Sequence, residues 1–319
     1  MGFFELVFTA IGASVVFCYV LKTLRLLKVL FPKLWDTLPG NFFTSMGEWA
    51  VITGGSDGVG KAYALELAQR GMNVVIISRS VEKLKKTAEE IEKTSGKTVK
   101  VLAADFTKDN VYESIEKTLK NQSVGILGKY HVFSLLNIIN NVGMLPTPIP
   151  CKFLNMKFLE RRLNEVINCN TKAMMHMCRL VLPGMEKRGK GVILNVSSGM
   201  ATIPFPTYTL YTASKVCVDT FSQGLQAEYK AKGIIIQAVT PFAISTHMTG
   251  YQKPNLITLT PEKFVKTSLA YLKAGDKTFG SIPHTIMGWI LQTVPIQFFH
   301  TEKMQQQLIE LVKKNNTSL

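Results

Sequence analysis

The sequence TGGSDGVG occupies residues 53–60, directly after a short apolar run, Trp49–Thr53. A helical pattern follows it and stops at Gly71. A strand, a glycine-rich turn and a helix in this order let the backbone approach a pyrophosphate, whose charge then faces the free N–H groups at the start of the helix. Glycines also build ordinary turns, so the triplet Gly54, Gly58 and Gly60 gains weight from the strand and helix around it. The stretch predicts a dinucleotide site.

The next apolar run, Val74–Ile77, ends in Ser78 and Arg79. An NAD enzyme would place a carboxylate here to bind the ribose hydroxyl, whereas an arginine favours a 2′-phosphate. The position therefore indicates NADP rather than NAD, with a solvated arginine at a strand end as the alternative. Asp105 follows a further apolar run and could accept a hydrogen bond from the adenine amino group or cap a turn.

A second group of residues indicates acid chemistry. The apolar run Val192–Val196 leads to Ser198, and Tyr211 and Lys215 follow at a spacing of i, i+4, which places them on one helical face. Free tyrosine has a pKa of about 10, and an adjacent ammonium stabilises the phenolate. The pair is therefore a candidate general acid, although a Tyr-x-x-x-Lys pair taken alone is more often part of an exposed helix surface. Tyr208 has no cation four residues further on, which makes it the weaker candidate.

The amino-terminal stretch from Leu6 to Leu21 carries no charge. Together with Phe3 and Phe4 it approaches the length needed to cross a bilayer core of about 30 Å. A glutamate precedes the apolar stretch, and the basic residues Lys22, Arg25, Lys28 and Lys33 follow it. This order argues against a cleaved signal peptide and places the rest of the chain in the cytoplasm. We expect a retained membrane anchor; a buried core helix is the alternative.

Composition narrows the possible partners. The 319 residues are 46% hydrophobic, which excludes a disordered chain, and the formal charge of +15 suits a lipid surface, a nucleic acid or a phosphorylated cofactor. Lysines alternate with glutamates over residues 82–93, the pattern of a solvated helix face and not of a nucleic-acid patch. The five cysteines form no C-x-x-C pair and the five histidines show no metal spacing, so we expect a reducing compartment and no metal site.

Taken together, the motifs are far more specific for one protein family than any of them is alone. TGGSDGVG is followed by NNVG at Asn140–Gly143, by Asn170 in NCNTKA, by NVSSG around Ser198 and by YTASK at Tyr211–Lys215. From about residue 46 to 248 the order and spacing resemble the short-chain dehydrogenase/reductase family. The resemblance implies an α/β fold of the Rossmann type, a doubly wound parallel sheet flanked by helices, here with an N-terminal transmembrane helix.

The resemblance also implies a role for each matching residue. Ser198 would hold and polarise a substrate carbonyl, Tyr211 would donate the proton, Lys215 would bind the nicotinamide ribose and lower the tyrosine pKa, and Asn170 would position a water in the proton relay. The residues expected to bind NADPH or NADP are Thr53, Gly54, Ser56, Gly58, Gly60, Ser78, Arg79, Asp105, Asn141, Gly143, Lys215 and Thr246. The sequence departs from the family at Phe242, after Pro241, where glycine is usual.

Within the family, the anchor and the phrases GEWAVITG, KAYALELA, ADFTKDN, NNVGMLP and TYTLYTASK are similar to the membrane-bound 17-beta-hydroxysteroid dehydrogenases. This implies reduction of the 17-oxo group of an apolar steroid by an enzyme of the endoplasmic reticulum membrane with a cytosolic catalytic domain. A homodimer is compatible with this resemblance. A sister group, the very-long-chain 3-oxoacyl-CoA reductases of fatty-acid elongation, shares most of these phrases. An inactive membrane scaffold is a third alternative, because eleven extra residues, Gly128–Ile138, are inserted at the central strand.

We expect residues 135–139 to form that strand, with 125–130 as a loop. The chain then divides into an anchor and basic flank (1–45), an NADP-binding domain (46–280) and an apolar C-terminal segment and tail (281–319). In the last part, the run Ile282–Phe299 could be a pocket wall or a surface resting on the membrane; Pro283, His284 and Pro295 argue against a second span.

Overall fold

The computed structural model of the chain describes residues 2–30, 38–121 and 136–316. Within them the strands are β1 (Trp49–Thr53), β2 (Asn73–Ser78), β3 (Val99–Ala103), β4 (Leu136–Asn140), β5 (Gly191–Val196), β6 (Ile234–Val239) and β7 (Lys277–Thr278). They form one parallel sheet in the order β3-β2-β1-β4-β5-β6-β7. The order reverses between β1 and β4, so the sheet is doubly wound, as predicted, and a crevice is expected where the reversal occurs.

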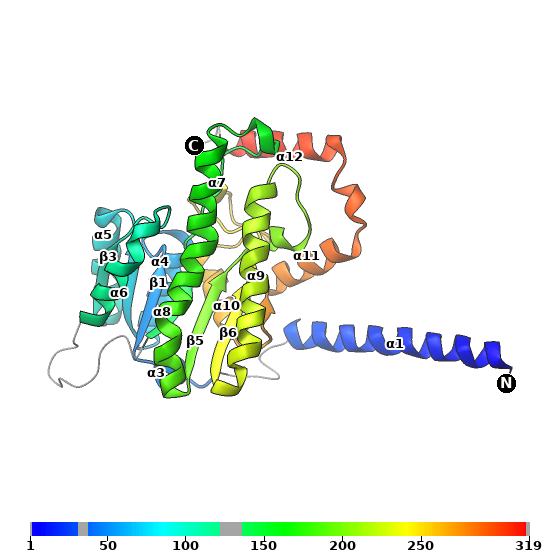
Figure 1. Ribbon diagram of the computed structural model, residues 1–319, viewed down its shortest axis with the longest axis horizontal. Helices are drawn as coiled ribbons and strands as arrows, with labels where there is room; N and C mark the ends of the chain where they lie inside the picture. The colour runs from blue at the N-terminus through cyan, green and yellow to red at the C-terminus, as the bar shows by residue number, and fades with distance from the viewer. Residues whose placement is uncertain (1, 31–37, 122–135, 317–319) are drawn as a thin grey trace.

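Helices cover both faces of the sheet (Figure 1). The helices α4 (Gly58–Gln69), α5 (Val81–Ser95) and α10 (Pro261–Ala270) pack on one face, and α6 (Tyr112–Asn121), α8 (Ala173–Arg188) and α9 (Thr209–Tyr229) pack on the other. Side chains of β1 alternate between the two cores: Ala50 and Ile52 join the first, Trp49 and Val51 the second. Every residue of β1 is buried, which explains its continuous apolar sequence.

The central strand forms although the last three residues of the insertion, 136–138, belong to it. β4 begins at Leu136 and pairs with β1 from Trp49↔Leu136 to Thr53↔Asn140. The predicted strand, 135–139, is therefore confirmed with a shift of one residue. The first residue of that prediction and the expected loop at 125–130 lie outside the described part of the chain.

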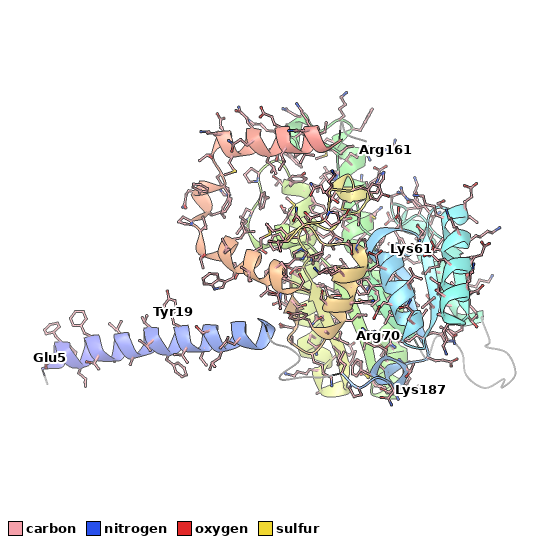
Figure 2. The ribbon with its side chains drawn as sticks, turned by 180° about the vertical axis from the view of Figure 1, so that it is seen from behind. Glu5, Tyr19, Lys61, Arg70, Arg161 and Lys187 are labelled. Carbon is pink, nitrogen blue, oxygen red and sulfur yellow. The ribbon has the colours of Figure 1, made fainter. Side chains whose placement is uncertain are left out.

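Most of the remaining helices lie towards the ends of the chain, and α7 lies in its middle. The long helix α1 (Phe3–Leu30) extends away from the sheet and is followed by the short α3 (Phe42–Met46); α7 (Leu159–Ile167) precedes α8, and α11 (Ile282–Thr293) and α12 (Glu302–Asn316) form the C-terminal part. In α1 the segment Phe3–Leu21 is long and apolar enough to cross a membrane, and none of it is buried in the protein. Seen from behind, Glu5 and Tyr19 on α1 lie far from Lys61 and Arg70, which mark the two ends of α4 (Figure 2). An unburied apolar helix excludes the core-helix alternative and supports membrane association.

Candidate active site

The candidate residues gather at the carboxyl ends of the strands next to the point of reversal. Thr53 ends β1, Ser78 ends β2, Asn141 follows β4, and Ser198 lies two residues after β5. Ligands of open α/β sheets bind at this edge. The fold therefore brings together residues that lie up to 145 positions apart in the sequence.

The glycine turn leaves room for backbone to approach backbone. Gly54 and Gly58 have φ angles of +68° and +51°, which side chains other than glycine rarely adopt. Gly60, in the first turn of α4, lies so close to its neighbours that a Cβ atom there would be 2.2 Å from the Gly54 carbonyl oxygen and 2.5 Å from Nδ2 of Asn141. The methyl group of Thr246 borders the same turn, 3.0 Å from the position of a Cβ on Gly58. The turn is thus a cradle that larger residues would fill.

Asn141 and Thr53 hold this cradle against the central strand. Nδ2 of Asn141 donates to the carbonyl oxygens of Thr53 at 3.1 Å and Gly54 at 3.4 Å. In return, the Thr53 hydroxyl accepts hydrogen bonds from the backbone N–H groups of Asn141 at 3.0 Å and Val142 at 3.1 Å. These reciprocal bonds fix the distance between β1 and the end of β4, which is why the insertion before β4 does not displace the turn.

Polar groups at the end of β2 lie next to the glycine turn. The Ser56 hydroxyl donates to the Ser78 hydroxyl at 2.8 Å, which ties the glycine turn to β2. Arg79, the next residue, is exposed. An exposed guanidinium beside the glycine turn has the fork geometry that binds a phosphate.

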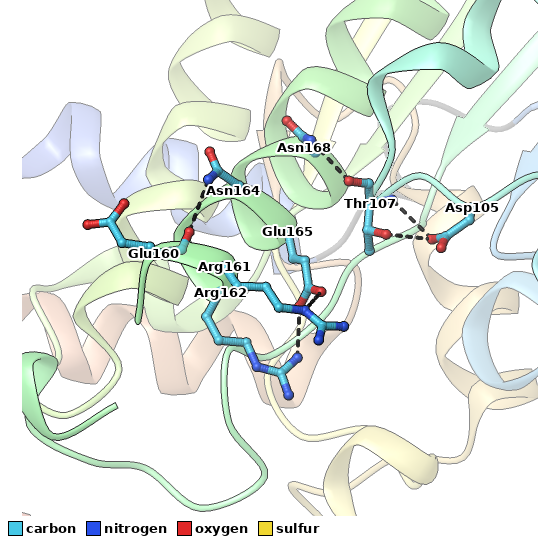
Figure 3. A network of polar contacts seen from close by, with 8 residues as sticks. All are labelled: Asp105, Thr107, Glu160, Arg161, Arg162, Asn164, Glu165 and Asn168. Atoms are coloured by element: carbon cyan, nitrogen blue, oxygen red, sulfur yellow. Dashed lines mark hydrogen bonds and ion pairs between the residues drawn. The ribbon is translucent and has the colours of Figure 1, made fainter. Parts of the chain in front are cut away.

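Asp105 caps a turn. One of its carboxylate oxygens accepts hydrogen bonds from the backbone N–H of Thr107 at 3.1 Å and from its hydroxyl at 2.9 Å. The Thr107 carbonyl oxygen in turn accepts from Nδ2 of Asn168 at 3.0 Å (Figure 3). Asp105 thereby connects the end of β3 to the turn between α7 and α8. Of the two roles that the sequence allowed, capping a turn is therefore favoured over binding the adenine amino group.

The candidate acid residues lie around the start of α9. Tyr211 and Lys215 lie on one face of this helix, with Nζ of Lys215 5.9 Å from the centre of the Tyr211 ring. Nζ of Lys215 donates to the Val196 carbonyl oxygen at 3.0 Å, which anchors the side chain to the end of β5. The Tyr211 hydroxyl shares a hydrogen bond with Ser198. Tyr211, Lys215 and Ser198 are all at least nine-tenths buried.

Burial sets the protonation of this group. Burial raises the pKa of the Tyr211 phenol, and the hydrogen bond from Ser198 opposes that shift only in part. Burial also lowers the pKa of Lys215 to about 8, with Cys169 and Asp219 acting in the opposite direction. Loss of solvent around the phenolate is therefore the largest influence on the Tyr211 pKa, and the predicted lowering by Lys215 stays a prediction. The tyrosine stays protonated at neutral pH.

Asn170 lies in a π-helical turn, Asn168–Lys172, between α7 and α8. Such turns widen a helix locally and are common at functional sites. Nδ2 of Asn170 donates to the Met144 carbonyl oxygen at 3.0 Å and to the Ser214 hydroxyl at 3.0 Å, and Oδ1 accepts from Met144 N–H at 2.8 Å. The Ser214 hydroxyl donates to the Tyr211 carbonyl oxygen at 2.6 Å.

Ser214 thus links Asn170 to the helix that carries Tyr211, and the sequence did not single it out. The only available signal was its position between Tyr211 and Lys215. Gly143 completes this corner: a Cβ atom there would be 3.1 Å from Nζ of Lys215 and 3.5 Å from Oδ1 of Asn170. A larger residue at this position would press on these two buried polar groups.

Two aromatic residues near the site are Tyr208, the weaker candidate for the acid, and Phe242, which stands where the family usually has glycine. Tyr208 lies next to Tyr211, with ring centres 6.5 Å apart, and burial raises its pKa to about 12. The Phe242 ring stacks on Phe279 at 5.7 Å and packs over Gly199, where a Cβ would be 2.6 Å from the ring. Phe242 is not among the described residues with positive φ, so its backbone does not require the glycine that the family usually has there.

The sequence from residue 48 to 256 matches the family model "short chain dehydrogenase". Because this match covers more than half of the chain, the protein belongs to the short-chain dehydrogenase family. Its fold and its candidate site agree with that membership.

Individual relatives show which members of the family the chain is similar to. The chain is 52% identical to 17-beta-hydroxysteroid dehydrogenase type 3 of Danio rerio, with 98% of both chains covered. It is 43% identical to the very-long-chain 3-oxoacyl-CoA reductase-A of the same species, over 88% of this chain and 83% of the relative. Among solved structures, a short-chain dehydrogenase from Sphingobium yanoikuyae in complex with NADPH is 27% identical, with a TM-score of 0.62, and covers 72% of this chain and 86% of its own.

Proposed function

We propose that this protein reduces the 17-oxo group of a steroid to the 17-beta-hydroxyl with NADPH, as in the conversion of androstenedione to testosterone. The observation that carries the proposal is the buried arrangement of Tyr211, Ser198 and Lys215 beside the glycine turn. The 52% identity to 17-beta-hydroxysteroid dehydrogenase type 3 over nearly the whole chain supports the steroid as substrate.

The residues present fit a phosphorylated dinucleotide. The cradle at Gly54, Gly58 and Gly60 would hold the pyrophosphate at the N-terminus of α4, and Arg79 beside Ser78 would pair with the 2′-phosphate. We assign the remaining cofactor contacts to Ser56, Gly143, Lys215 and Thr246. Thr53, Asp105 and Asn141 would act indirectly, through the backbone that they fix. The bound nucleotide supplies the hydride.

The chain's own groups supply the proton and its control. Because burial raises its pKa, Tyr211 keeps its proton at neutral pH and can give it to the oxygen that becomes the alcohol. Ser198 is within hydrogen-bond reach of the same hydroxyl and would stabilise the developing negative charge on that oxygen. The ammonium of Lys215 faces the tyrosine ring and favours the phenolate that remains after proton transfer. Asn170, fixed by Met144 and Ser214, would position a water that returns the proton.

An assay of the full chain in membranes tests the proposal. With NADPH, membranes that contain the protein should convert androstenedione to testosterone faster than they reduce a long-chain 3-oxoacyl-CoA, and membranes with Tyr211→Phe should do neither. A preference for the acyl-CoA would establish the elongation reductase instead. If the protein bound NADPH but reduced neither the steroid nor the acyl-CoA, the inactive scaffold would be favoured. The scaffold has less support, because β4 and the Asn141–Thr53 bonds are in place behind the insertion.

We further propose that the protein resides in the endoplasmic reticulum membrane with its catalytic part in the cytosol. The support is the unburied apolar segment Phe3–Leu21 and the basic residues Lys22, Arg25 and Lys28 that follow it. Carbonate washing should leave the chain in the membrane, and protease added to sealed microsomes should digest most of it. Protection of the catalytic part would place it in the lumen.

Homodimerisation is a separate proposal. Met174 and Met177 of α8 are buried in the core, whereas Met175 faces a groove between α8 and α9 together with Leu182 and Phe221. A second copy could cover this groove. Sedimentation of the detergent-solubilised chain should give a dimer, and a monomer at all concentrations would contradict the proposal.

A further inference from the structure

The helix α11 presents an apolar face to the outside of the protein. Ile282, Ile286, Trp289 and Ile290 follow the spacing i, i+4, i+7 and i+8, and their exposed fractions are 45%, 46%, 52% and 47%. We call these four residues the α11 face. A stripe at this spacing lies on one side of a helix. Contiguous exposed apolar side chains on a folded protein mark a place where something else binds.

The opposite side of α11 is fixed to the protein, so the orientation of its apolar face is determined. His284 is fully buried, and its ring nitrogens contact the Phe242 N–H at 3.4 Å and the Ile257 carbonyl oxygen at 2.9 Å. Gly288 packs so closely on the Phe279 ring that a Cβ there would be 2.1 Å from it. The α11 face cannot turn inward without breaking these contacts.

The chain segment that contains α11 also carries no charge. From Thr278 to Thr301 the sequence contains no Asp, Glu, Lys or Arg. Next to the helix, the loop that bonds to His284 exposes Leu256 by 88% and Ile257 by 46%. After the helix, Phe298 is 61% exposed. A water-facing helix normally carries charged residues on its outer side, and this one carries none.

Continuity with α1 identifies the occupant. α11 contacts α1, and both views show it close to the inner end of that helix, where α1 meets the rest of the protein (Figures 1 and 2). The apolar segment of α1 ends at Leu21, nine residues before the helix itself ends at Leu30. A helix beside this emerging end lies at the level of the membrane surface. An amphipathic helix with Trp on its apolar side is suited to that level.

We propose that α11 is an in-plane membrane helix whose face Ile282, Ile286, Trp289 and Ile290 lies in the boundary between lipid headgroups and acyl chains. The inference requires that α1 is a membrane span, but it does not depend on which ketone the protein reduces. Because α11 also contacts the turn Gly199–Thr202 directly after Ser198, it would hold the candidate active site at the lipid surface. An apolar substrate is concentrated in the lipid at this surface.

Trp289 provides a direct test, because it reports its own surroundings. The full chain is reconstituted in phosphatidylcholine nanodiscs whose acyl chains are either unmodified or brominated near the headgroup, since bromine quenches tryptophan emission on contact. The emission assigned to Trp289 is the difference between the wild type and Trp289→Phe, which removes the contributions of Trp35 and the buried Trp49. We expect the brominated lipid to remove most of this difference.

A matched control uses Leu311, which is 56% exposed on α12, distant from α1 in both views. Leu311→Trp in the Trp289→Phe background should keep its emission in brominated lipid. Unquenched emission from Trp289 would overturn the proposal. Quenching of that emission by acrylamide would then show that the α11 face is in water, and resistance to acrylamide would show that protein covers it. Neither result depends on enzymatic activity, so a failure here is distinct from a failure of the proposed reaction.

Discussion

Replacing Gly60 with alanine should damage both the fold and the nucleotide site, although alanine is the better helix former. The substitution gains about 0.5–1 kcal/mol of helix stability. Against this, the new methyl group would lie 2.2 Å from the Gly54 oxygen and 2.5 Å from Nδ2 of Asn141. The first of these atoms belongs to the backbone of the glycine turn and the second is held by two hydrogen bonds, so neither can move without loss.

The expected size follows from these contacts. Forcing an extra methyl group into a packed site costs about 1–3 kcal/mol, and losing one hydrogen bond of Asn141 costs about 1 kcal/mol. After the helix gain is subtracted, Gly60→Ala should destabilise the protein by about 1–3 kcal/mol. Displacement of the turn should also weaken NADPH binding about tenfold or more, since each tenfold change corresponds to about 1.4 kcal/mol.

Gly224 offers a matched control, because it also lies inside a helix, α9, and a Cβ there would meet nothing within 4 Å. Gly224→Ala should leave NADPH binding unchanged and raise stability slightly. Nucleotide fluorescence measures NADPH binding, and thermal unfolding of the solubilised chain measures stability. If Gly60→Ala behaved like Gly224→Ala in both assays, the turn would not be the rigid cradle inferred here.

Three further predictions concern the site. Tyr211→Phe should lower reduction about 10²- to 10⁴-fold with NADPH affinity nearly intact, whereas Tyr208→Phe should retain most activity; the reverse result in a steroid assay would transfer the acid role to Tyr208. Arg79→Asp should weaken NADPH far more than NADH, because a charge-assisted contact of about 1.5–3 kcal/mol becomes a repulsion; equal losses in a binding titration would make Arg79 structural. Since burial lowers the pKa of Lys215 to about 8, reduction should decline as the pH rises through about 8. Stability should rise between about pH 8 and 10.5, because the unfolded chain binds more protons than the folded chain in this range. Lys215→Met should show neither pH effect, and a variant that kept both would show that another group titrates there.

Much of this site could be predicted because its parts lie in local patterns. The glycine turn after Trp49–Thr53 and the pair Tyr211 and Lys215 each combine a residue type with a spacing that one strand or one helix imposes. The position of the central strand at the insertion could also be predicted. A strand buried between β1 and β5 must be apolar, and the sequence contains an apolar run next to Asn140. The predicted start was wrong by only one residue.

Other features depend on contacts that no local pattern encodes. The π-helical turn at Asn168–Lys172 has no periodicity of its own, so neither the turn nor the link from Asn170 through Ser214 to Tyr211 could be read from the sequence. That burial raises the Tyr211 pKa could not be read from the sequence either. Spacing shows that a cation is near, but only the fold shows how completely solvent is excluded.

The same limit applies to the C-terminal segment, where the sequence left a pocket wall and a membrane surface as alternatives. Apolar composition is identical in both cases. The deciding observation is the direction of the side chains: His284 and Gly288 face the protein, so Ile286 and Trp289 must face away from it, beside α1. One helix can therefore serve both roles, because its inner side contacts Phe242 and the loop at Ile257 near the candidate site while its outer side is free to enter the lipid.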